Sequence, residues 1–92
     1  MTSQSIIYTG KITWLGEGGE TGIITRTDSV PAGQPVDFFF NIKNVMIGTP
    51  AIGKFAQFTP DFTDVKRPIA QYVILLEDAA KGAHINAEFE QN

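Results

Sequence analysis

The stretch ETGIITRTDSVPAGQPVDFFFNI, residues 20–42, decides the fold. Runs rich in β-branched and aromatic residues stand at both of its ends and are typical of β-strands. The centre, residues 28–35, holds two prolines and a glycine and is predicted to be a loop. Three consecutive phenylalanines, Phe38 to Phe40, stand in the second run. Because neighbouring side chains of a strand point to opposite faces, Phe39 must leave the core that the other two enter.

Length, composition and charge restrict the class of protein. The chain has 92 residues, which suits one domain, and 42% of them are hydrophobic, as expected of a chain that folds. The absence of cysteine excludes disulfides and thiolate chemistry, and it fits a cytoplasmic location. No apolar run approaches the ~20 residues that span a bilayer, so we expect no membrane association. The net charge of −3 argues against strong non-specific attraction to duplex phosphates.

On both sides of this stretch, apolar and polar residues mostly alternate with a period of two. The strands are predicted at residues 6–15, 22–27, 36–42, 54–59 and 69–76. Residues 17–19 are predicted to form a turn, and residues 43–53 an irregular segment with at most one short helical turn. Five short strands without a long helix predict an all-β domain at residues 1–76, most economically a small closed barrel. The C-terminal extension, residues 77–92, alternates cleanly at 84–90 and favours an extra strand there.

Four motifs in these strands follow a known order. They are GKITWLG at 10–16, GETGII at 19–24, DFFFNI at 37–42 and RPIAQYV at 67–73. The corresponding motifs of the cold-shock domain read Gly-x-Val-Lys-Trp-Phe-Asn, Lys-Gly-aromatic-Gly-Phe-Ile, Val-Phe-Val-His-aromatic and Gly-Pro-Gln-Ala-x-Asn-Val. Residues 8–74 therefore resemble this family, with a longer loop between the second and third strands. The resemblance implies a five-stranded OB-fold barrel that binds single-stranded RNA or DNA as a chaperone or regulator.

The resemblance also implies a face for each side chain. It directs five residues into the barrel: Ile24, Phe38, Phe40, Phe58 and Val73. It places Phe39 outward beside Trp14, where stacked bases cover the exposed rings. The implied binding residues are Trp14, Ile23, Phe39, Asn41, Ile42 and Ile47, with Lys11 and Lys43 meeting phosphate. Four other basic residues could also supply phosphate contacts, but surface solubility is the role expected of them: Arg26, Lys54, Lys66 and Arg67.

The chain departs from the family where most of the other stacking aromatics stand. Thr21 and Ile23 replace two of them, Asn41 and Ile42 replace the histidine and aromatic that follow the exposed phenylalanine, and Ile47 stands for a loop aromatic. We therefore expect weak binding and a short footprint. A second interpretation stays open, in which the tail, the long loop or another subunit covers Phe39. The barrel would then use this face for a homodimer or a protein partner.

No residue pattern supports catalysis, a metal site or a cofactor. His84 is the single histidine and has no cysteine beside it, whereas zinc requires three or four ligands. Asp61 and Asp64 lie in a predicted loop and are expected to be solvated, since a hard cation needs six or more oxygens. No Gly-x-Ser-x-Gly nucleophile turn is present. We therefore expect a binding protein and not an enzyme.

Overall fold

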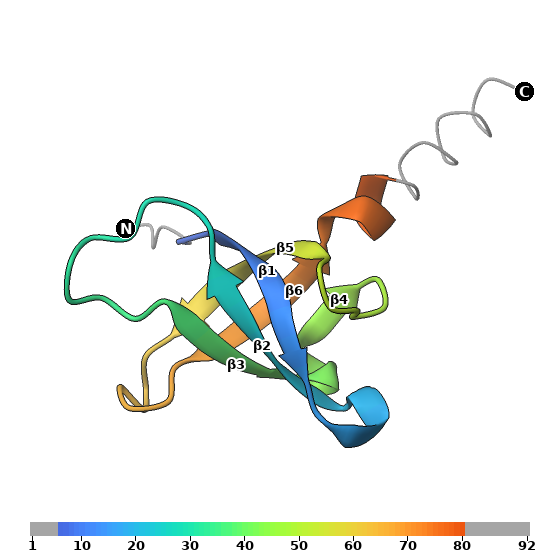
Figure 1. The fold of residues 1–92 in the computed structure, drawn as a ribbon, viewed down its shortest axis with the longest axis horizontal. Helices are drawn as coiled ribbons and strands as arrows, with labels where there is room; N and C mark the ends of the chain where they lie inside the picture. The colour runs from blue at the N-terminus through green and yellow to red at the C-terminus, as the bar shows by residue number, and fades with distance from the viewer. Residues whose placement is uncertain (1–5, 81–92) are drawn as a thin grey trace, which may run out of the picture.

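Five strands close on themselves to form a barrel (Figure 1). The computed structural model describes residues 6–80. Its elements are β1 (Tyr8–Leu15), η1 (Glu17–Gly19), β2 (Thr21–Arg26), β3 (Asp37–Asn41), η2 (Ile42–Asn44), β4 (Val45–Ile47), β5 (Phe55–Asp61) and β6 (Ile69–Leu75), where η1 and η2 are single 3-10 turns. Residues 76–80 are helical. None of the helical segments within residues 6–80 is long and apolar enough to cross a membrane.

The strand order around the ring is β3-β2-β1-β5-β6, and a parallel pairing of β3 with β6 closes it. The other four pairings of the ring are antiparallel. This is the arrangement of an OB-type barrel, so the prediction of a small all-β barrel with five strands is confirmed. Closure leaves few unpaired strand edges, which is an advantage for a domain of this size.

One extra strand, β4, lies outside the ring. β4 pairs in parallel with β6, with Val45 opposite Val73. It falls in the segment that was predicted to be irregular, because its three residues are too few to show a period of two. The strand predicted at 84–90 lies outside the described residues.

The core is a single cluster inside the barrel. All five residues that were predicted to point inward are buried, together with Ile12, Ala56, Ala70 and Leu75. The Phe38 and Phe58 ring centroids are 5.0 Å apart, and Tyr8 meets both rings edge-on. Burying a side chain of this size stabilises the fold by roughly 1.5–3 kcal/mol, so this cluster dominates the stability of the barrel.

The prediction that Arg26 serves surface solubility is wrong. Its exposed fraction is only 8%, and its guanidinium carbon lies 3.5 Å from the centre of the Tyr8 ring. The Nε atom donates to Asp28 Oδ1 at 2.8 Å, and an Nη atom donates to the carbonyl of Ser29 at 3.2 Å. Arg26 therefore holds the start of the long β2–β3 loop against the barrel. Its burial is possible because the long stem packs on an aromatic face while the charge is paired.

Candidate functional site

Four apolar side chains form a continuous row across the outside of the barrel. Trp14 of β1 pairs with Ile23 of β2, Ile23 pairs with Phe39 of β3, and Phe39 pairs with Ile69 of β6. Side chains of directly paired residues lie on the same face of a sheet, so the four are neighbours there. The Trp14 side chain is 48% exposed and Phe39 is half-buried. We call this set the apolar row.

A β-bulge in β1 turns Trp14 to the outside. Ile12 is fully buried, and regular alternation would direct Trp14, two residues further on, into the same core. The pairing with β2 instead shifts by one residue between Ile12 and Trp14, which leaves Thr13 as the extra residue. Both Thr13 and Trp14 are consequently exposed. The predicted outward position of Trp14 agrees with the structure, but the bulge that produces it was not predicted.

The indole of Trp14 rests on the hairpin that joins β1 to β2. The Gly16 N–H donates to the Thr21 carbonyl at 2.8 Å. A Cβ at Gly16 would lie 3.1 Å from Trp14 Cη2 and 2.6 Å from Thr21 Oγ1. A side chain at Gly16 would therefore displace the indole. The absence of one allows the ring to lie against the hairpin and keep one face open to solvent.

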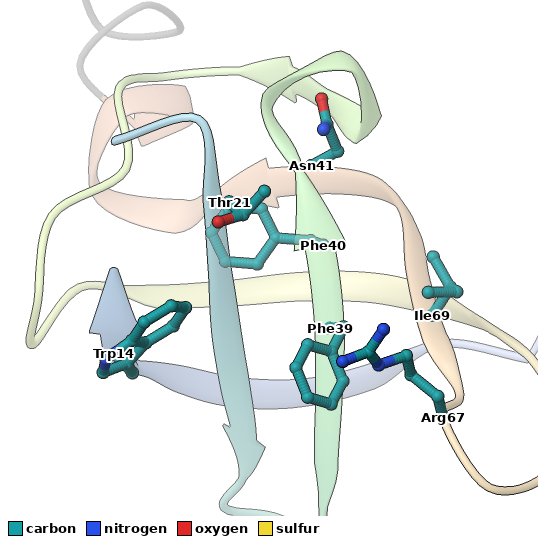
Figure 2. A pocket seen from close by; sticks show the side chains of 7 residues that line it. All are labelled: Trp14, Thr21, Phe39, Phe40, Asn41, Arg67 and Ile69. Carbon is teal, nitrogen blue, oxygen red and sulfur yellow. The ribbon is translucent and has the colours of Figure 1, made fainter. Parts of the chain in front are cut away.

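Arg67 partly covers Phe39. Its guanidinium carbon lies 4.6 Å from the centre of the Phe39 ring, and it comes from the loop between β5 and β6 (Figure 2). The Phe39 N–H donates to the Pro68 carbonyl at 3.0 Å, which holds this loop beside β3. Arg67 was expected to serve surface solubility, with phosphate contact as the alternative, and this contact with Phe39 is an additional role. No local pattern of residues predicts this contact, because it depends on the closure of the barrel.

A hollow of about 330 Å³ lies along the apolar row and defines the candidate site. Its lining residues are Trp14, Thr21, Phe39, Phe40, Asn41, Arg67 and Ile69. Figure 2 shows Trp14 and Phe39 on either side of β2, with the Arg67 guanidinium beside the Phe39 ring. Among these seven residues Arg67 is the only charged one. We call this feature the Trp14–Phe39 hollow.

Asn41 lines this hollow but also has a structural task. Its side-chain Oδ1 accepts a hydrogen bond from the Lys43 N–H at 2.9 Å, and its own N–H donates to Asn44 Oδ1 at 2.8 Å. The two bonds form a capping box that begins η2. The side-chain oxygen of Asn41 is thereby engaged, and its side-chain NH2 group remains as the donor available to a ligand.

The structure separates the predicted site residues into two groups. Trp14, Ile23, Phe39 and Asn41 lie together, and Lys11 lies further along the same face of β1, with its Nζ 5.8 Å from the Phe55 ring centre. Of the predicted residues, only Trp14, Phe39 and Asn41 line the Trp14–Phe39 hollow itself. The remaining three belong neither to the hollow nor to the apolar row: Ile42, Lys43 and Ile47. The first two belong to η2, and Ile47 belongs to β4, which pairs with β6 at Ile74, five residues along the strand from Ile69 of the apolar row.

The sequence analysis missed Ile69 and the role of Thr21. Ile69 joins the apolar row through the parallel pairing with β3, a contact between segments thirty residues apart that no local pattern reveals. From the sequence, Thr21 was noted only as a position where the cold-shock domain has an aromatic residue. In the structure its side chain lies beside the indole of Trp14. Pro68 between Arg67 and Ile69 matched the family motif and was the only signal for this region.

The carboxylate of Asp61, next to the apolar row, is engaged in hydrogen bonds. Asp61 of β5 pairs with Ile69 and accepts hydrogen bonds from the Thr63 hydroxyl at 2.6 Å and from the Thr63 N–H at 2.9 Å. These two bonds lower the pKa of the Asp61 carboxyl below its ordinary value of 3.8. Within residues 6–80, no three histidine, cysteine, aspartate or glutamate side chains form a metal-binding group.

Comparison with known proteins gives no further evidence about the function. No protein-family model matches the chain, and no curated protein matches it at a significant level. Function is therefore inferred from the exposed apolar row and the groups around it.

Proposed function

We propose that this protein binds single-stranded RNA or DNA on the apolar row, as a divergent barrel of the cold-shock type. The observation that carries the proposal is a pair of outward-facing aromatic rings on either side of β2, the exposed Trp14 and the half-buried Phe39. Exposed aromatic rings on an OB-type sheet are platforms on which bases stack, each worth about 1–3 kcal/mol. Strands lie about 4.8 Å apart, so rings on β1 and β3 stand about 10 Å apart and hold two separate bases.

The contact between Arg67 and Phe39 is compatible with base stacking. A cation over an exposed aromatic ring is worth about 0.5–1 kcal/mol, whereas a stacked base is worth about 1–3 kcal/mol. A base therefore displaces the guanidinium from the ring. Arg67 then lies beside the backbone of the bound nucleic acid, where its guanidinium N–H groups can donate two hydrogen bonds to one phosphate. Lys11 on the same face is the second phosphate contact.

The affinity is expected to be low. Two aromatic platforms contribute about 2–6 kcal/mol together, and Ile23 and Ile69 cover base or sugar surface without a π system. A dissociation constant of 1 μM corresponds to about 8.2 kcal/mol. Dissociation constants in the micromolar range or weaker are therefore expected near physiological salt, tightening as the salt concentration falls.

The test is a titration of short oligonucleotides followed by the fluorescence of Trp14, the only tryptophan of the chain. Oligo-dT and oligo-U should quench this fluorescence at low salt, and Phe39→Ala should weaken the binding about fivefold or more. Phe62→Ala is the matched control, because Phe62 is also exposed, at 39%, but neither lines the hollow nor contacts Lys11. It should leave the affinity unchanged.

Two results would contradict the proposal. One is the absence of quenching and of any binding at low salt, and the other is equal loss of binding in the two phenylalanine variants. Absence of binding together with a dimer in light scattering would favour the alternative, in which the apolar row is a contact between protein chains.

A further inference from the structure

Tyr72 in β6 has a backbone conformation that tyrosine rarely adopts. Its φ is +52°, and within residues 6–80 it is the only residue besides glycines with a positive φ. Left-handed values place the Cβ too close to the following carbonyl oxygen, so they cost free energy in residues other than glycine. Strained residues of this kind cluster at functional sites, where the surrounding structure holds them in place.

The conformation of Tyr72 belongs to a β-bulge that turns its ring outward. Phe58 of β5 stands opposite two residues of β6, Tyr72 and Val73, because the register shifts by one residue there. Ala70 and Val73 are both fully buried although they are three residues apart, whereas a regular strand buries alternate residues. Without the bulge Tyr72 would share the face of Ala70 and enter the core. With the bulge it is 60% exposed.

The outward ring borders a second hollow, of about 290 Å³. Its lining residues are Lys43, Asn44, Met46, Gln71 and Tyr72, and we call it the Tyr72 hollow. Tyr72 offers a flat ring face, and Met46 offers a flexible thioether that adapts to aromatic surfaces. Lys43 is the only charged residue of the lining and favours an anionic ligand. Asn44 Oδ1 accepts the Asn41 N–H and Gln71 Nε2 donates to Asp61 Oδ2 at 3.0 Å. The Asn44 side-chain NH2 group and the Gln71 side-chain carbonyl oxygen are groups of the kind that meet base edges.

The Tyr72 hollow adjoins the Trp14–Phe39 hollow. Asn41 of the first hollow donates its N–H to the side chain of Asn44 in the second, at 2.8 Å. Along β6, Ile69 lines the first hollow and Tyr72 the second. Three residues of a strand extend about 10 Å, a distance that one extended nucleic-acid strand crosses without leaving the surface.

We propose that the Tyr72 hollow is a second base-binding position for the same single-stranded nucleic acid, and this inference rests on the proposed function. One base stacks on the Tyr72 ring, and the Lys43 ammonium pairs with a neighbouring phosphate. The strained bulge is retained because it supplies this platform. Lys43 thus belongs to the binding surface, as the sequence analysis proposed, but at the Tyr72 hollow and not at the Trp14–Phe39 hollow.

The experiment compares two lengths of oligo-dT, about four and about eight nucleotides, within the range that OB folds cover. Tyr72→Gly removes the ring and relieves the left-handed backbone, Tyr72→Asn removes the ring with a residue that tolerates this conformation, and Tyr72→Phe keeps the ring. The first two variants should bind the longer oligonucleotide about fivefold or more weakly and the shorter one unchanged. Tyr72→Phe should match wild type. Tyr72→Gly should also unfold at the same or a higher temperature, since it relieves strain.

Each other result overturns the proposal. Unchanged binding of the longer oligonucleotide by Tyr72→Gly and Tyr72→Asn shows that no base uses the ring. Equal weakening at both lengths shows that the residue acts through the barrel or the first hollow. A change in oligomeric state alone shows that the hollow is a protein contact. If wild type binds neither length, the proposed function has failed and this inference fails with it, whereas failure of the ring variants leaves the Trp14–Phe39 hollow untouched.

Discussion

Gly22→Ala tests whether the packing of the core and the position of the exposed Trp14 indole depend on each other. A Cβ at Gly22 would lie 2.6 Å from two carbons of the Phe40 ring and 2.8 Å from the carbonyl oxygen of Trp14. Ordinary contact begins near 3.4 Å, so the ring and the β1 backbone would both have to shift by several tenths of an ångström. Phe40 is only 2% exposed and belongs to the core cluster, so moving its ring disturbs the packing around it. Overpacking of this kind typically costs about 1–3 kcal/mol.

The assay is thermal and urea unfolding followed by circular dichroism. In a domain of this size each kcal/mol lowers Tm by about 4–8 °C, so Gly22→Ala should lower it by roughly 5–20 °C. Trp14 fluorescence of the folded variant should also change, because the β1 carbonyl beside Gly22 belongs to Trp14. Gln57→Ala on the exposed side of β5 is the control and should change Tm little. A Gly22→Ala variant as stable as wild type, with unaltered fluorescence, would refute the reasoning.

Three further perturbations have defined outcomes. Partial burial alone would raise the pKa of Asp28, but hydrogen bonds from Arg26 and the Thr9 N–H, with the charge of Arg26, lower it below 3.8. Stability from this carboxylate is therefore complete above about pH 4 and lost as the pH falls through the lower folded pKa. Asp28→Asn should lower the free energy of unfolding by about 1–2 kcal/mol at pH 7, which is less than for a fully buried pair because the Asp28 side chain is 32% exposed. In acid unfolding, the variant should lose less stability than wild type as the pH falls. Phe58→Ala should cost about 3–5 kcal/mol in urea unfolding, and a cost below about 1 kcal/mol would show that the core packs differently. Arg67→Gln should reduce the slope of log affinity against log salt for oligo-dT by about 0.7, and an unchanged slope would exclude Arg67 from phosphate contact.

Local sequence patterns predicted most of the barrel. All five ring strands lie where alternation of apolar and polar residues placed them, with ends that differ by at most two residues. The inward and outward assignment of the phenylalanine triplet was also correct, because β3 is a regular strand without a bulge. Alternation along the sequence assigns side chains to the correct face of the barrel wherever the strand is regular.

The bulges and the long-range contacts could not be predicted in this way. At Thr13 and at Tyr72 one extra residue shifts the alternation, and nothing in the neighbouring side chains marks the shift. The parallel pairing that adds Ile69 to the apolar row depends on how the barrel closes. The burial of Arg26 depends on Tyr8 and Asp28, two residues from different segments that meet only in the fold.

The most direct test of the central claim is an NMR titration of the protein with short oligo-dT. Intermolecular NOEs should connect base protons to the ring protons of both Trp14 and Phe39, with upfield shifts of those ring protons as the bases stack. Shift changes confined to surfaces away from the apolar row, without NOEs to either ring, would contradict it.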